Sequence, residues 1–282
     1  MTPVRVVADS GCDLPEVLLK RYDIVTVPLM IQIGAESFLH GKVDLDTLWQ
    51  RLTREPAATT SAPPMGLFRE AFSRLVDAGH DVVCITLTGK HSSTFNTAWL
   101  AAQEFSGRVK VVDSWSISLG MGLQVLAAAI AAQAGHSADE IVRLVESLRS
   151  RMQIRIVLDT LEYVRRGGRL ARLMPVIDRM CRAFSIKPII GMTEGELRLV
   201  GAARSLKGAL QRIEEDIAAW NPLERVAVAH TRAPEVVEEV ARYLASRLDL
   251  LDKEILTSEA GPAFAVHAGP RALGVVWLPK AP

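Results

Sequence analysis

The chain has 282 residues, a length that suits two α/β domains better than one small core. Its 33 basic and 32 acidic side chains leave a formal net charge of +1, so the chain as a whole does not attract nucleic acid or an anionic membrane. The most apolar stretch, 119–134, is interrupted by Gly and Gln residues and falls short of the ~20 apolar residues of a membrane span. With no signal-peptide pattern at the N-terminus, we expect a cytoplasmic protein.

The cysteines and histidines show no metal-binding pattern. Cys12, Cys84 and Cys181 are widely spaced and form neither a CxxC pair nor a zinc-ligand arrangement. We therefore expect buried thiols in a reducing compartment. The histidines lack HxH and HExxH spacing, so no metal site is expected.

In the N-terminal half, short runs of β-branched residues alternate with helical patterns, as expected for parallel strands joined by crossover helices. The expected strands cover 4–8, 24–33, 81–87 and 109–113, and the expected helices cover 45–54, 67–77, 94–105 and 119–134. A further helix begins at Ser137, which with Glu140 has the spacing of a capping box. The pattern predicts a three-layer α/β domain over residues 1–151.

The pattern changes near residue 152, where a second domain, 152–282, is expected to begin. Thr193-Glu194-Gly195 separates two apolar runs and is typical of a hairpin turn, which implies antiparallel strands and a mixed sheet. The expected strands cover 154–159, 186–191, 196–201, 225–229, 253–257 and 273–278. A short helix is expected through Tyr163, and another is expected to end near Arg182. Two amphipathic helices are expected later, with apolar stripes over 206–217 and 236–244.

Polar loops follow three of the predicted strands. Asp9-Ser10, Thr88–Thr94 and Asp113-Ser114 come after strands whose carboxyl ends meet at one edge of a parallel sheet, where ligands of such sheets bind. Asp9 has a simpler interpretation as the cap of its loop.

Two hydroxyl-rich segments are candidates for holding an anion. Ser92, Ser93 and Thr94 precede a helix whose first N–H groups point toward the same place. Thr60 and Ser61 lie in a predicted loop before Pro63-Pro64. Each segment alone is also explained by ordinary helix capping. Their convergence on one edge favours capture of an anion.

Arg204 and His267 add candidate cations from the second domain. Arg204 stands just before a helix and has the alternative interpretation of a surface ion pair. His267 precedes Gly269-Pro270 and has the alternative interpretation of a core histidine. The sequence contains no G-x-S-x-G elbow, no phosphate-binding P-loop and no dinucleotide fingerprint. We therefore predict binding of an anion and no catalytic residue.

Seven short motifs stand in order along the chain. They are Asp9-Ser10-Gly11-Cys12-Asp13-Leu14, Thr60-Ser61-Ala62-Pro63, Ser92-Ser93-Thr94-Phe95-Asn96-Thr97-Ala98, Asp113-Ser114 with Gly120-Met121-Gly122, Leu161-Glu162-Tyr163-Val164-Arg165-Arg166-Gly167-Gly168-Arg169, Ile186-Lys187-Pro188-Ile189, and His267-Ala268-Gly269-Pro270. In these motifs the chain resembles the DegV family, the fatty-acid-binding proteins of the bacterial fatty acid kinase system. The resemblance implies a three-layer N-terminal domain with a parallel sheet and a two-layer C-terminal domain with a mixed sheet that covers an acyl chain.

The resemblance also implies a ligand, a site and partners. The ligand would be a long-chain fatty acid such as palmitate, stearate or oleate, with no cofactor and no metal. Its carboxylate would bind Thr60 and Ser92, with Arg204 and His267 close by and with Ser61, Ser93 and Thr94 as neighbours. A separate ATP-using fatty acid kinase would phosphorylate the carboxylate for phospholipid metabolism, and contact with a membrane would be transient.

The chain departs from the family pattern at four positions. Ser93 replaces a glycine, His40 an aspartate, Ala62 a glutamine, and Arg271 the second glycine of Gly-Pro-Gly. Arg271 would strengthen anion capture or change how a partner docks. Two other functions remain as alternatives: a hydrolase or acyl-transfer enzyme that uses the Ser/Thr loop, and a regulatory protein that senses a lipid.

Overall fold

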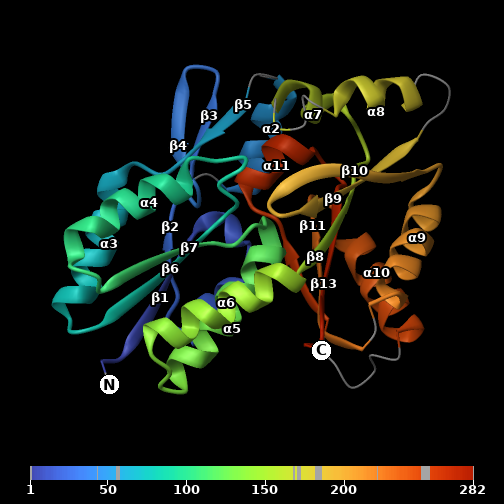
Figure 1. Cartoon of the computed structure of the whole chain (residues 1–282). Helices are drawn as coiled ribbons and strands as arrows, with labels where there is room; N and C mark the ends of the chain where they lie inside the picture. The colour runs from blue at the N-terminus through green and yellow to red at the C-terminus, as the bar shows by residue number, and fades with distance from the viewer. Residues whose placement is uncertain are drawn as a thin grey trace. The chain divides into compact units, whose positions relative to one another are not determined.

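The computed structural model describes residues 2–42, 44–54, 58–167, 169, 173–181, 186–220, 222–248 and 255–281, with the backbone alone at 166–167 and 180–181. The chain divides into two compact units, coloured from blue at the N-terminus to red at the C-terminus in Figure 1. The first unit contains Met1–Ser150 with the short segments Glu194–Glu196 and Gly261–Ala263. The second contains Arg151–Thr193, Leu197–Ala260 and Phe264–Pro282.

The first unit is built on a four-stranded sheet in the order β2-β1-β6-β7. The strands are β1 (Val4–Asp9), β2 (Val25–Val27), β6 (Asp81–Thr86) and β7 (Val109–Asp113). All three pairings are parallel. Neighbouring residues such as Val82 and Val83 are both fully buried although they face opposite sides, so both faces of the sheet are covered. The predicted parallel sheet is confirmed.

Helices cover both faces of this sheet (Figure 1). On one face, α3 (Met65–Asp77) and α4 (Thr94–Ala102) pack Phe68, Phe72 and Ala98 against Val7 and Cys84. On the other face, α5 (Ser118–Gln133) packs against β1 and the short η1 (Ser10–Cys12). The remaining helices of this unit are α1 (Glu16–Arg21), α2 (Leu45–Arg54), η2 (Gln103–Phe105) and α6 (Ala138–Arg151). The unit therefore has the expected three layers.

The single strand predicted for 24–33 was wrong. The chain leaves the parallel sheet after β2 and forms β3 (Met30–Ile33), the middle strand of a separate antiparallel sheet with β4 (Glu36–Leu39) and β5 (Ala58–Ser61). Pro28 stands at the break, where its missing N–H cannot continue a ladder. Because β5 contains Thr60 and Ser61, these residues lie on a strand and not in the predicted loop.

The second unit is built on a six-stranded mixed sheet in the order β10-β9-β8-β13-β11-β12. The strands are β8 (Gln153–Val157), β9 (Lys187–Thr193), β10 (Glu196–Ala203), β11 (Leu223–His230), β12 (Leu256–Glu259) and β13 (Leu273–Pro279). β8 pairs antiparallel with β9 and β13, and β11 pairs antiparallel with β13 but parallel with β12. The mixed sheet is confirmed; positions 253–254 of the strand predicted at 253–257 lie outside the described residues.

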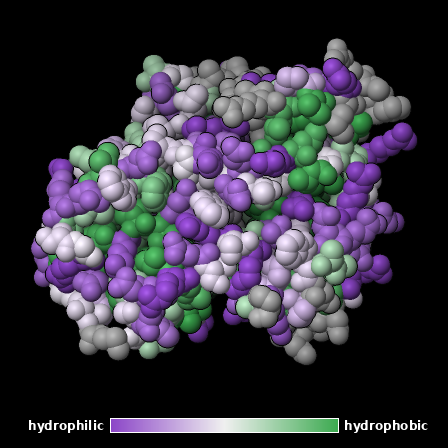
Figure 2. Space-filling model, in the orientation of Figure 1, coloured by the Kyte–Doolittle hydropathy of each residue, from purple (hydrophilic) through white to green (hydrophobic). Residues whose placement is uncertain are grey.

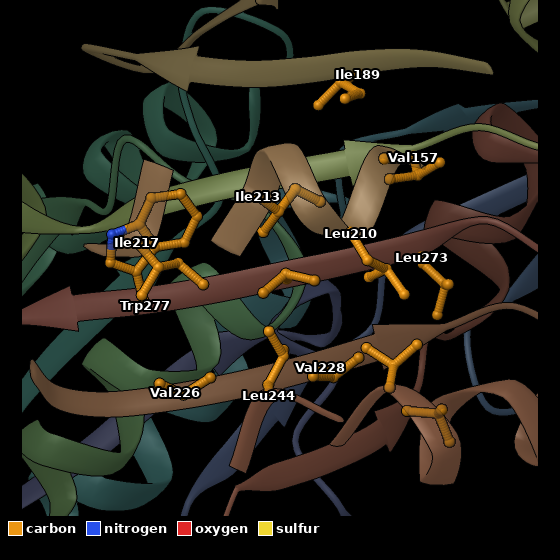
Figure 3. Packing of buried hydrophobic residues seen from close by; sticks show 14 of the residues in the cluster. Val157, Ile189, Leu210, Ile213, Ile217, Val226, Val228, Leu244, Leu273 and Trp277 are labelled. Atoms are coloured by element: carbon orange, nitrogen blue, oxygen red, sulfur yellow. The ribbon is translucent and has the colours of Figure 1, made fainter. Parts of the chain in front are cut away.

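Two long helices of the second unit pack on this sheet, α9 (Leu206–Ala218) and α10 (Pro234–Arg247). Figure 3 shows Ile213, Ile217 and Leu244 meeting Trp277 and the valines of β11 in one apolar cluster. The guanidinium of Arg155 lies over the Trp277 ring, 5.1 Å from its centroid. The other helices are α7 (Glu162–Gly167), α8 (Met174–Cys181) and α11 (Pro262–Ala268).

The surface shown in Figure 2 is largely hydrophilic, with hydrophobic residues in separate patches. No helix in the described part of the chain is both long and apolar enough to cross a membrane. Cys12 and Cys84 are free, buried thiols, as predicted, whereas the side chain of Cys181 is not among those described.

Candidate functional site

The segment between β6 and α4 brings two of the predicted hydroxyls together. The Oγ atom of Ser92 lies 2.8 Å from Oγ1 of Thr94 and accepts a hydrogen bond from the Thr94 N–H at 3.3 Å. Thr94 is fully buried, Ser92 is half-buried and Ser93 is exposed. The Ser93 side chain makes no capping hydrogen bond, although its carbonyl accepts from the Thr97 N–H at 2.9 Å. Simple capping by Ser93 therefore does not account for this segment.

The second predicted hydroxyl pair, Thr60 and Ser61, is divided by the strand on which it lies. Thr60 stands opposite Ile31 and Ser61 opposite Met30 in the antiparallel ladder. Successive side chains of a strand point to opposite faces. Thr60 shares its face with the buried Ala58, whereas Thr59 and Ser61 are exposed. Thr60 is therefore on the inner face of β5, and Ser61 is not.

Two carboxylates, the buried Asp9 and the half-buried Asp113, hold the loops around Ser92. Asp9 accepts hydrogen bonds from the N–H groups of Gly11 (2.9 Å) and Leu87 (2.7 Å), so it ties the loop after β1 to the loop after β6. Asp113 accepts from the N–H groups of Gly89 (3.0 Å) and Trp115 (2.9 Å). Complete burial raises the pKa of Asp9 to about 7, although the same two N–H groups lower it. Asp9 thus has the structural role of a loop cap.

Asp13 and His40 lie together in the same unit. Asp13 Oδ1 accepts a hydrogen bond from the Gly261 N–H at 2.9 Å, and the His40 ring leaves no space for a side chain at Gly261, since a Cβ there would lie 2.5 Å from it. Burial raises the pKa of Asp13 to about 6 and lowers the pKa of His40 to about 4. At neutral pH His40 is therefore an uncharged packing residue.

In the second unit, His267 on α11 lies close to Arg169. Burial, with a smaller effect from the Arg169 charge, lowers the pKa of His267 to about 4. The imidazole is therefore neutral at pH 7 and not the cation suggested by the sequence. It can still donate a hydrogen bond through its N–H. Next to it, Gly269 has a φ of +76°, and a Cβ there would lie 2.6 Å from the Tyr163 ring, so only glycine fits.

Arg204 and Arg271 lie at other places in the second unit. Arg204 is exposed between β10 and α9, directly before Ser205, whose hydroxyl accepts from the Gly208 N–H and caps α9. Arg271 has a φ of +59°, and its guanidinium is 3.0 Å from Glu235. Both side chains are exposed, so this is a surface ion pair.

A family model described as "Uncharacterised protein, DegV family" matches residues 3–280. The chain belongs to the DegV family. A DegV domain-containing protein of Caldanaerobacter subterraneus subsp. tengcongensis is 35% identical over 286 residues, which are 99% of this chain and 100% of that protein. These findings confirm the resemblance seen in the motifs.

Two solved structures of DegV-family proteins are similar over nearly the whole chain. A fatty-acid-binding DegV family protein from Thermus thermophilus has a TM-score of 0.86 at 28% identity, over 99% of this chain and 100% of that one. DegV of Bacillus subtilis, a fatty acid binding protein, has a TM-score of 0.86 at 25% identity, over the same shares. The DegV-like fold is thereby shown.

In this DegV-family protein, sequence reasoning left two residues near the candidate groups without a role. Arg169 stands at the end of one of the seven motifs with no predicted role of its own, yet its charge acts on His267. Thr88 was read only as the first residue of a polar loop, yet it is fully buried and makes several hydrogen bonds. The sequence pointed to Thr88 only because it is a polar residue at the carboxyl end of a predicted strand. Among the described residues, no three His, Cys, Asp or Glu side chains gather as metal ligands.

Proposed function

We propose that this DegV-family protein binds a long-chain free fatty acid and keeps its carboxylate accessible to a partner. The observation that carries the proposal is the likeness, over 99% of the chain, to a fatty-acid-binding protein of the same family. Residues 1–151 would hold the head group through their loops, and residues 152–282 would cover the acyl chain.

The hydroxyl pair of Ser92 and Thr94 has the chemistry that a carboxylate needs. A carboxylate taken out of water without donors is costly, and charge-assisted hydrogen bonds offset that cost. When Ser92 Oγ accepts from the Thr94 N–H and from the Thr94 hydroxyl, its own hydrogen is left to point at a ligand. The first-turn N–H groups of α4 add the positive end of a helix dipole. Ser92 thus suits a donor to an anion.

The other proposed head-group contacts come from both parts of the chain. Thr60 would donate from the inner face of β5, and His267 would act as a neutral donor beside Arg169. Arg204 would supply a guanidinium, while Ser61 and Ser93 would remain at the margin because both are exposed. The head group would fix orientation, because the tail supplies most of the affinity. At ~0.8 kcal/mol per CH₂, about 16 carbons give a gross driving force on the order of 10 kcal/mol.

The partner in this proposal is an ATP-using fatty acid kinase that phosphorylates the bound carboxylate for phospholipid metabolism. The DegV-family protein would be a cytoplasmic carrier that contributes no catalytic residue and touches membranes only transiently. In support, the hydroxyl of Ser92 has another hydroxyl as its hydrogen-bonding neighbour, whereas a serine nucleophile needs a base.

Lipid analysis of the purified protein tests the proposal. We expect native mass spectrometry to detect a bound fatty acid and the delipidated protein to take up palmitate. Ser92→Ala should weaken palmitate binding roughly 10-fold, since a hydrogen bond to a charged group is lost. Ser73→Ala removes a hydroxyl from the exposed side of α3 and serves as the control.

Two results would contradict the carrier function. One is a protein without lipid that takes up no palmitate. The other is turnover of acyl esters, or of ATP with palmitate, by the protein alone, which would favour the enzyme alternative. Equal palmitate affinity of Ser92→Ala and wild type would remove Ser92 from the site.

A further inference from the structure

The turn between β9 and β10 has a backbone that only a few residues adopt. Glu194 and Gly195 have φ values of +48° and +80°, the left-handed pair typical of a type I′ hairpin turn. The segment Glu194–Glu196 is part of the first compact unit, where it lies against the loop after β6. The hairpin turn predicted from the sequence is therefore present, and it contacts the loop after β6.

Thr88 is the centre of that contact. Its hydroxyl donates to the Gly195 carbonyl at 2.9 Å and accepts from the Lys90 N–H at 3.2 Å. Its backbone N–H donates to the Ser116 carbonyl at 2.9 Å, and its carbonyl accepts from the His91 N–H at 3.3 Å. All of its hydrogen-bonding groups are thus engaged, and the side chain is fully buried.

Gly195 is required by the closeness of this contact as well as by its φ angle. A Cβ at position 195 would lie 2.4 Å from Thr88 Oγ1 and 3.3 Å from Lys90 Cγ. A side chain there would displace Thr88 or the turn, because the hydroxyl is held on both sides. The hydrogen bond to the Gly195 carbonyl would be lost with either movement.

We infer that Thr88 and Gly195 are positioning residues for the head-group site. Ser92 follows Thr88 by four residues, and the N–H groups of Lys90 and His91 are both bonded to Thr88. The turn orients the Thr88 hydroxyl, the hydroxyl fixes the start of the 88–93 loop, and the loop aims the Ser92 hydroxyl. This inference rests on the proposed function of Ser92, but the anchoring of the loop is a property of the protein without ligand.

Paired glycine variants test the anchor. Gly195→Ala is compared with Gly79→Ala, which has a similar left-handed φ of +90° but no atom within 4 Å of the added Cβ. Both variants strain the backbone, and only the first disturbs Thr88. We expect amide hydrogen exchange over residues 89–94 to accelerate in Gly195→Ala and to match wild type in Gly79→Ala.

Ligand binding is measured on the same proteins with palmitate and with methyl palmitate, which has the tail without the charge. For Gly195→Ala we expect palmitate affinity to fall about 5- to 10-fold, as for one lost hydrogen bond, with methyl palmitate affinity unchanged. Thr88→Val should behave like Gly195→Ala, and Thr88→Ser, which keeps the hydroxyl, should restore exchange and binding. If Gly195→Ala fails to fold, the comparison of Thr88→Val with Thr88→Ser tests the positioning role instead.

The outcomes separate this inference from the proposed function. Wild type that binds no palmitate refutes the proposed function, while the exchange rates still decide whether the loop is anchored. If wild type binds palmitate but Gly195→Ala and Thr88→Val keep wild-type exchange and wild-type palmitate affinity, the positioning role is wrong. Equal losses for palmitate and methyl palmitate would also overturn it, because the effect would then not act through the head group.

Discussion

At the scale of single residues, burial shifts the pKa of the titratable groups and so decides which of them are charged at pH 7. His267 was a candidate cation by residue type, but its burial beside Arg169 makes it neutral at pH 7. Sequence indicates the type of a side chain, whereas its pKa depends on which residues surround it. The carboxyl of Asp9 shows the opposite shift for the same cause, since burial raises its pKa to about 7.

The pH dependence of stability tests the state of His267. Its folded pKa, about 4, is below the ordinary value of 6.5, so the unfolded chain binds more protons between these values. The contribution of His267 to stability is therefore present above pH 6.5 and is lost as the pH falls toward 4. Lowering the pH from 7 to 4 should therefore reduce the free energy of unfolding less in His267→Gln than in wild type. At 1.36 kcal/mol per pKa unit, the difference between the two losses is up to about 3 kcal/mol.

Urea unfolding at several pH values measures this difference. Asp9 and Asp13, whose pKa values are raised, act in the opposite direction, so the variant must be compared with wild type at each pH. His136→Gln, at an exposed site, serves as the control for the substitution itself. Parallel curves for His267→Gln and wild type would contradict the lowered pKa, because they would mean that His267 has the same pKa in the folded and unfolded chain.

At the scale of elements, structure that depends on residues close together in the chain was predicted correctly. Ser137 and Glu140 form the expected capping box: the Ser137 N–H donates to the Glu140 carboxylate at 2.8 Å and the Glu140 N–H to Ser137 Oγ at 3.4 Å. β7 and α2 have the bounds expected from their apolar patterns. The sheet formed by β3, β4 and β5 was missed because β5 is short and polar, and its partner β3 is distant in sequence.

The site could be predicted only in part for the same reason. Residue type identified Ser92 and Thr94 as candidates, and their spacing of two brought them into hydrogen-bonding distance. The contact between Thr88 and Gly195 joins residues 107 positions apart, and no local pattern contains that information. The opposite orientation of Thr60 and Ser61 depended on β5, which the sequence did not reveal.

The packing of α5 on η1 gives a prediction for this pair of elements. A Cβ at Gly122 would lie 2.5 Å from the carbonyl oxygen of Cys12 and 3.2 Å from the Leu14 side chain. Alanine normally stabilises a helix relative to glycine. Here the backbone of η1 would have to move, so Gly122→Ala should destabilise the protein by about 1–3 kcal/mol.

Gly66→Ala in α3 is the matched control, because nothing lies within 4 Å of the added Cβ. It should leave stability unchanged or raise it by up to about 1 kcal/mol. Urea denaturation of both variants measures the two free energies of unfolding. A Gly122→Ala variant as stable as Gly66→Ala would mean that α5 does not pack closely against η1.

At the scale of the whole molecule, burial of an aliphatic tail sets how affinity depends on chain length. Each buried CH₂ contributes about 0.8 kcal/mol, which corresponds to a roughly fourfold lower dissociation constant per carbon. A carrier that holds only the carboxylate would bind decanoate and palmitate alike. For the proposed function, affinity should rise steadily from decanoate to palmitate and level off where the chain exceeds the enclosed length.

Thermal unfolding of the delipidated protein with saturated fatty acids of 10 to 18 carbons measures this dependence. A ligand that binds the folded state stabilises it by an amount that grows with the logarithm of ligand concentration divided by Kd, and the melting temperature rises accordingly. Ser92→Ala should lower the stabilisation by every chain length equally, because it removes a head-group contact and leaves the tail unchanged. A melting temperature independent of chain length would contradict tail burial. A loss in Ser92→Ala that grows with chain length would place Ser92 along the tail and not at the carboxylate.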